Sequence, residues 1–257
     1  MCVVKLLGYT GRSATLCIMK HMHPHNQKNH PESGNALFYI LIAVSLLAAL
    51  SYAVSEGNRT SIAALTQDRS QLMAAQVIEY GDVLSKAVSQ MRLRGTTINT
   101  LRFAHDDLDA TYGTYGMDPD NEVFHPNGGA VNYQTLPSVI TANPDWIFTA
   151  ENLVEEIGRT CGDSSCSELL AIATGINSTV CTTINDLLNV SNAASVPPAD
   201  DDIPTATLFA GTFDYSGEVI GDGDGSVGGS NMAGQSAACV LDDTTGENVF
   251  YQVLWRQ

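Results

Sequence analysis

The residues with the clearest chemical meaning are two aspartates in a glycine-rich stretch near the C-terminus. Asp222 and Asp224 occur in the run Asp-Gly-Asp-Gly, and glycines between carboxylates let several oxygens turn towards one hard cation. An EF-hand would need a glutamate at loop position twelve, where this chain has Ala233. Two interpretations stay open: a calcium site with Asp214 or Glu218 as a further ligand, or a flexible acidic glycine turn.

Four cysteines follow residue 160 and offer a second kind of chemistry. They are Cys161, Cys166, Cys181 and Cys239. Four cysteines allow three pairings. Cys161 and Cys166 bracket a polar loop that could close on itself, and Cys181 and Cys239 would then join a helix to the C-terminal region. The spacing is not that of a zinc site and no histidine follows nearby, so we expect disulfides rather than a metal centre or a nucleophile.

Nothing in the sequence predicts an enzyme. The chain has no GxSxG motif for an activated serine, and paired acids such as Glu155 and Glu156 are interpreted as a helix surface. The formal net charge of −16 disfavours nucleic-acid binding, because an acidic protein repels phosphate. We therefore expect no catalytic residues and no cofactor other than the calcium considered above.

The elements that position these residues begin with one apolar segment. Residues 36–54 carry no charge, and as a helix they span roughly 28 Å, close to the hydrocarbon core of a bilayer. Residues 1–35 carry four basic residues against one acid, and basic flanks stay in the cytoplasm. We expect a single-pass protein of the inner (cytoplasmic) membrane, in contact with lipid, with a periplasmic or extracellular C-terminal domain. A plain anchor and a signal peptide ending near Ala53 are the alternatives.

Residues 55–95 are expected to continue the membrane helix as an amphipathic helix. Apolar residues recur at steps of three and four along one stripe; they are Met73, Val77, Tyr80, Leu84, Val88 and Met91. The opposite face is polar. Gly95 is placed to end the helix.

Residues 96–257 are expected to form an extracytoplasmic globular domain. Its first part is rich in glycine, proline and asparagine, with short strands at 122–124 and 130–133. Helices are predicted at 150–158 and 167–190, with Gly175 as an interruption. Residues 195–204 are interpreted as a linker, within which the run of three aspartates at 200–202 is solvated. Strands are predicted at 205–213 and 217–220, followed by a hairpin with strands at 238–241 and 249–255.

These elements together predict an α+β fold. A long N-terminal helix, first transmembrane and then amphipathic, is expected to pack on a small C-terminal antiparallel sheet accompanied by extra helices. The domains are a basic leader at 1–35, a transmembrane helix at 36–54, an amphipathic helix at 55–95 and a globular domain at 96–257.

This layout resembles the type IV pilin and pseudopilin family. The resembling stretch runs from Glu32-Ser-Gly34-Asn35 through Tyr52-Ala-Val54. In that family a prepilin peptidase cuts after the glycine, which implies a cut between Gly34 and Asn35, and the mature helices bundle into a filament. The family usually carries a glutamate five residues after the cut, where this chain has Tyr39. Some minor subunits lack that acid, so the resemblance implies a minor subunit.

The function expected from the sequence is therefore structural. The protein would be a subunit of a pilus-like or secretion-type filament or its assembly machine, with like or related pilin-type subunits as partners through the N-terminal helix. The alternative is a membrane-anchored extracytoplasmic binding or sensor domain that does not polymerise.

Overall fold

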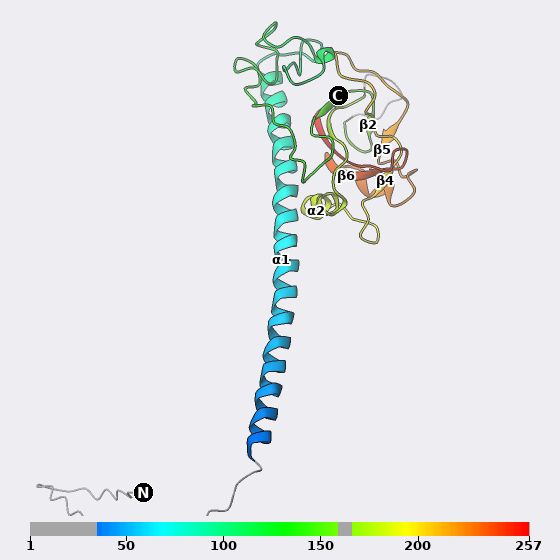
Figure 1. The fold of residues 1–257 in the computed structure, drawn as a ribbon. Helices are drawn as coiled ribbons and strands as arrows, with labels where there is room; N and C mark the ends of the chain where they lie inside the picture. Colours follow the sequence, from blue (N-terminus) through cyan, green and yellow to red (C-terminus); the bar gives the residue numbers. More distant parts are fainter. Residues whose placement is uncertain (1–34, 159–165, 257) are drawn as a thin grey trace, which may run out of the picture. The chain divides into compact units, whose positions relative to one another are not determined.

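The chain divides into two compact units that share one helix. The computed structural model describes residues 35–158 and 166–256, and the units are Met1–Gly57 and Asn58–Gln257. Helix α1, Asn35–Leu93, contributes its first part to one unit and its second part to the other (Figure 1). The second unit begins at Asn58 and so includes the second part of α1, whose residues from Ala74 to Met91 contribute to its core.

The second unit mixes helices and strands, which confirms the predicted α+β class at that level. After α1 its elements are η1 Ala110–Tyr112, β1 Ile147–Thr149, β2 Leu153–Val154, β3 Leu169–Ala173, α2 Ser178–Leu188, β4 Ala199–Asp200, β5 Val219–Ile220, η2 Gly229–Met232, β6 Ala237–Asp242 and β7 Asn248–Trp255.

A five-stranded sheet in the order β1-β3-β7-β6-β4 forms the centre of this unit. Its neighbours are antiparallel except for β4, which runs parallel to β6. Strands β2 and β5 form a separate parallel pair. The expected antiparallel sheet is mixed instead, because the edge strand β4 joins it parallel to β6. The β6–β7 hairpin itself is confirmed.

Each face of the sheet covers its own hydrophobic core. Phe250 and Leu254 of β7 point to the core that contains the α1 stripe, whereas Tyr251 and Val253 point to the core that contains Ile220. This alternation follows from the two-residue period of a strand. Helices α1 and α2 therefore lie against one face, and the segment that carries β5 lies against the other.

The amphipathic part of α1 whose side chains the structure describes, from residue 67 onward, packs one face into the core. Its buried apolar side chains are Ala74, Val77, Tyr80, Leu84, Ala87, Val88 and Met91. Gly81 lies so close to the sheet that an added Cβ would come within 3.3 Å of Phe250. The helix ends at Leu93, and Gly95 follows with a φ of +100°, which favours glycine.

Two predicted helices were wrong. Residues 150–158 contain strand β2, and the first part of 167–190 is strand β3; only Ser178–Leu188 is helical. Leu169–Ala173 is a run of apolar residues buried on both faces of a central strand, and such a short run does not distinguish strand from helix by period. Gly175, with a φ of +67°, separates β3 from α2.

Three predicted strands were also wrong. Residues 122–124 and 130–133 contribute an isolated bridge between Glu122 and Arg102 but no strand, and residues 205–213 contain none. A compact turn replaces the first two, since Gly129 donates to the Glu122 carbonyl and Ala130 to that of His125. Residues 205–213 lie against the rest of the unit without forming a strand ladder. One hydrogen bond in this segment runs from the N–H of Phe209 to the carbonyl of Phe148.

Candidate functional site

The first candidate surface is the apolar end of α1. Ala36–Ala53 has a mean hydropathy of 2.2 and none of it is buried within the chain. Leu47, for example, is 72% exposed. This is the one helix among the described residues that is long and apolar enough to cross a membrane. Asn35 begins α1, whereas Gly34 lies outside the described residues.

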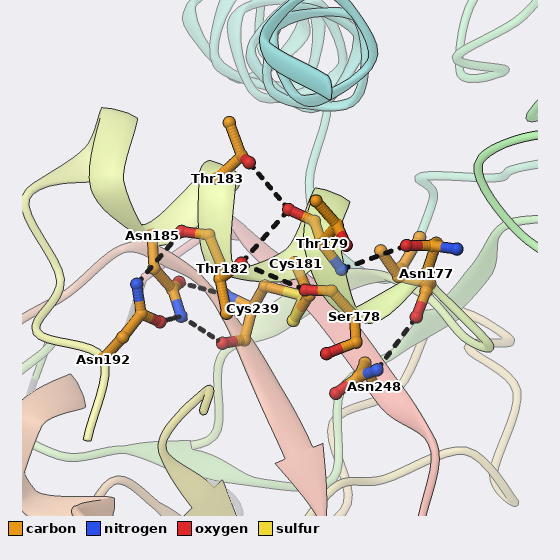
Figure 2. Close-up of a disulfide and its surroundings, with 11 residues drawn as sticks. Asn177, Ser178, Thr179, Cys181, Thr182, Thr183, Asn185, Asn192, Cys239 and Asn248 are labelled. Atoms are coloured by element: carbon orange, nitrogen blue, oxygen red, sulfur yellow. Dashed lines mark hydrogen bonds between the residues drawn. A yellow bond between two sulfur atoms is a disulfide. The ribbon is translucent and has the colours of Figure 1, made fainter. Parts of the chain in front are cut away.

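The second candidate site is the disulfide between Cys181 of α2 and Cys239 of β6 (Figure 2). The two cysteines are 58 residues apart, and both are fully buried. This pairing was one of those the sequence allowed. It ties α2 to the face of the sheet that also receives α1, because both cysteines belong to the same core.

A buried amide reinforces this link. The Nδ2 of Asn185 donates to the Cys239 carbonyl at 2.7 Å, and its Oδ1 accepts from the Cys239 backbone N–H at 2.8 Å. Asn185 thus pairs with β6 ahead of the point where β4 begins, since the parallel strand β4 pairs only with Leu241 and Asp242. Buried backbone groups need such partners. Sequence reasoning missed Asn185, although an asparagine on the apolar face of a predicted helix was a usable signal.

Cys166 is also disulfide-bonded and is fully buried beside the start of β3. Cys161, its expected partner, lies outside the described residues. The expectation that the cysteines after residue 160 form disulfides is therefore confirmed for Cys181 and Cys239, and the pairing of Cys166 with Cys161 stays a prediction.

Carboxylates gather where the β6–β7 hairpin meets β4. We define the acidic end as the exposed side chains of Asp201, Asp222, Asp224, Asp243 and Glu247. Asp243 accepts hydrogen bonds from the backbone and hydroxyl of Ser226, and its own N–H donates to the Asp200 carbonyl. These bonds bring the loop at 222–226, the aspartate run and the hairpin turn into one surface.

Two aspartates lie beneath the acidic end. Asp200 is fully buried and accepts from the backbone N–H groups of Asp202 and Gly221, while Asp202 accepts from that of Val219. The interpretation of 200–202 as a solvated linker was therefore wrong for these two residues. The carboxylates serve as acceptors for backbone donors that the short strands β4 and β5 leave unpaired.

Burial and crowding of like charges shift the titration of this region. Burial raises the pKa of Asp200 to about 6. Burial also raises the pKa of Asp202, and a hydrogen bond with Glu218 adds to the shift. The pKa of Asp224 rises to about 6, chiefly because its side chain shares a hydrogen bond with Asp222. Ionised carboxylates therefore repel one another here at neutral pH.

The structure groups the predicted calcium ligands differently from the sequence. Oxygens of Asp201, Asp202 and Asp224 lie within 4.8 Å of one another. Asp222 neighbours Asp224 but is outside that group, and Asp214 lies elsewhere, where its N–H donates to the Ala150 carbonyl. Carboxylate oxygens are the donors that calcium prefers, so this trio is where a hard cation would find ligands.

A polar hollow at the other end of β7 was not expected from the sequence. The hollow has a volume of about 360 Å³, and Arg92 and Trp255 both line it. The guanidinium of Arg92 lies 4.4 Å from the centre of the Trp255 ring. Arg256 and the hydroxyls of Ser85 and Ser89 also line the hollow. An arginine and a tryptophan separated by more than 160 positions give no local sequence signal for such a contact.

Comparison of the chain with protein-family models, with curated proteins and with solved structures gives no match.

Proposed function

We propose that the protein is a pilin-like structural subunit, held in a membrane by the first part of α1 and assembled through that helix with like or related subunits. The observation that supports this most is the different use of one helix along its length. Residues 36–53 expose apolar side chains, whereas the stripe from Ala74 to Met91 is buried in the globular unit. The apolar stripe of the second half is thus buried within the chain. The apolar side chains of the first half would be buried by lipid or by the helices of other subunits.

The proposed topology follows from charge. The basic leader stays in the cytoplasm, and the acidic globular unit is extracytoplasmic, where its disulfides persist. Small residues such as Ala43, Ala48 and Ala49 within the apolar segment allow close approach of neighbouring helices. In this proposal the chain works by packing rather than by catalysis.

The mass of the mature protein tests the processing step. Purified from membranes of cells that carry a prepilin peptidase, the chain is expected to begin at Asn35, and a Gly34→Leu variant to keep its leader. A wild-type chain that keeps residues 1–34 contradicts the processing step, and a start near Val54 indicates secretion instead.

Cross-linking in intact membranes tests assembly. A photoactivatable residue in place of Leu41, in the apolar part of α1, is expected to capture another copy or a related subunit. The same residue in place of Leu72, an exposed position in the second unit, is the matched control and should give a lower yield.

Tyr39 stands where the family has the glutamate that supports assembly, so a chain that does not assemble, an anchored binding or sensor domain, is the alternative to a minor subunit. That domain would remain monomeric, so its prediction is an intact leader and no cross-link at Leu41. The two experiments therefore separate a subunit from an anchor.

A further inference from the structure

The two ends of strand β7 carry opposite charge. Residues 160–255 contain thirteen acidic residues and no lysine or arginine. Where β7 begins, at Asn248, the structure gathers the acidic end. Where it stops, at Trp255, the hollow receives Arg92 from α1 and Arg256 from the chain's last residues. Eight residues of strand separate the two ends by about 24 Å.

The hollow is cationic on balance. Its lining includes one carboxylate, that of Asp82, and two guanidinium groups. The carboxylate is already engaged, because Lys86 lies 3.8 Å from it. Among the residues that the structure describes, no acidic side chain lies within ion-pair distance of Arg92 or Arg256. Burial raises the pKa of Glu168 to about 7, and the charge of Arg256 partly offsets that rise, so Arg256 acts on this buried carboxylate from a longer distance. Planar guanidinium groups match carboxylates through paired hydrogen bonds.

The two charged ends lie in order along α1. Gly81 lies against Phe250 and Gln252, and Arg92, eleven residues later on α1, lies over Trp255. Strand β7 and this part of α1 therefore run in the same direction. The acidic end lies towards the earlier residues of the helix, and the hollow lies near the end of the helix.

From this arrangement we infer that the acidic end of one copy docks in the Arg92–Arg256 hollow of a second copy. The inference rests on the proposed function and names the contact that its globular units make. A symmetric contact that joined two acidic ends would bring like charges together, whereas the head-to-tail contact joins opposite charges. Such a contact uses two different surfaces, so every pair of copies still has one free acidic end and one free hollow. Further copies can therefore add at both ends, and a filament forms unless the rotation between copies closes the chain into a ring.

The experiment uses the full-length chain in membranes, with a photoactivatable residue in place of Ser89, an exposed residue of the hollow. It is expected to capture a second copy at residues 242–247. Arg256→Glu should lower that yield about five- to tenfold at low salt, and the loss should shrink in about 1 M NaCl because salt screens exposed charges. Combining Arg256→Glu with Glu247→Lys should restore the yield.

Arg69→Glu is the matched control, because it makes the same charge change at an exposed position on α1 outside the hollow. It should leave the Ser89 yield within about twofold of wild type. Thermal unfolding of each variant, followed by tryptophan fluorescence, shows that the fold is intact.

The outcomes separate the two proposals. A Leu41 cross-link with a Ser89 product that lies elsewhere, or that ignores the charge reversal, overturns the end contact and leaves the proposed function standing. A charge-dependent Ser89 product without a Leu41 cross-link supports the end contact and contradicts helix-mediated assembly. The absence of both products overturns both.

Discussion

Asn185 and Asp200 have the same role although their chemistry differs. Each puts a buried side chain where a strand partner is missing, Asn185 beside Cys239 of β6 and Asp200 beside Gly221. An amide can both donate and accept, so Asn185 satisfies an N–H and a carbonyl together. A carboxylate only accepts when it is ionised, so Asp200 binds two N–H groups and keeps its charge beneath other acids.

Asp202, the second buried carboxylate of this region, makes the stability of the fold depend on pH. The pKa of Asp202 is higher in the folded protein than in the unfolded chain, so between the two values the folded state binds more protons. The cost of ionising Asp202 is absent well below the unfolded pKa of about 4 and is fully present once the pH exceeds the folded pKa. This group therefore lowers the stability of the fold as the pH rises.

We predict that Asp202→Asn stabilises the protein at pH 7.5 and has little effect at pH 4.5. The amide keeps an oxygen to accept from Val219 and removes the charge. Urea unfolding at the two pH values measures the difference. Asp106→Asn, an exposed carboxylate outside the acidic end, is the control and should change little at either pH. An effect of the Asp202 variant that is equal at both pH values would rule out the titration as its cause.

At the scale of elements, the helix period was the most informative pattern. Every member of the predicted α1 stripe except Met73 is buried, and Met73 packs against the same core. This success has a physical reason: a long amphipathic helix repeats its signal over many turns. Strand β3 has five consecutive apolar residues, which show neither a helix nor a strand period. Strand β2 has only two residues, which is too few to show any period, so the sequence did not identify either segment as a strand.

Neighbouring residues of α1 provide a test of how the helix contributes to stability. Leu84 is fully buried and Val83 is 40% exposed. Leu84→Ala should lower the free energy of unfolding by about 3 kcal/mol, because it leaves a cavity in the core. Val83→Ala should cost less than about 1 kcal/mol. Urea denaturation measures both; equal losses would show that the predicted face of α1 is not the one that packs.

At the scale of the whole molecule, the division at Gly57 and Asn58 separates two kinds of burial. The described apolar segment of the first unit, Ala36–Ala53, exposes its side chains, whereas the second unit has two hydrophobic cores on opposite faces of one sheet. Both tryptophans, Trp146 and Trp255, belong to the second unit. Their fluorescence therefore reports on that unit alone.

This division predicts that membrane retention and folding respond to different substitutions. Charging the apolar segment with Val44→Lys and Leu47→Lys should release the chain from membranes, since each lysine costs roughly 3 kcal/mol near the bilayer centre. The urea midpoint followed by tryptophan fluorescence should not change. The control carries Val44→Leu and Leu47→Ile and should stay in the membrane. A charged variant that stays bound, or one whose midpoint shifts, would contradict the separation.

The amino-acid sequence alone determined the features that depend on neighbours along the chain. These are the apolar segment, the α1 stripe and the β6–β7 hairpin, each carried by a local period or turn. Only the tertiary structure decided which elements return to the hairpin, that Cys181 joins Cys239, that Asp200 and Asp202 are buried and that Arg92 meets Trp255. Those facts depend on contacts between residues far apart in the chain, and a local pattern of residues carries no information about which distant segment will meet it.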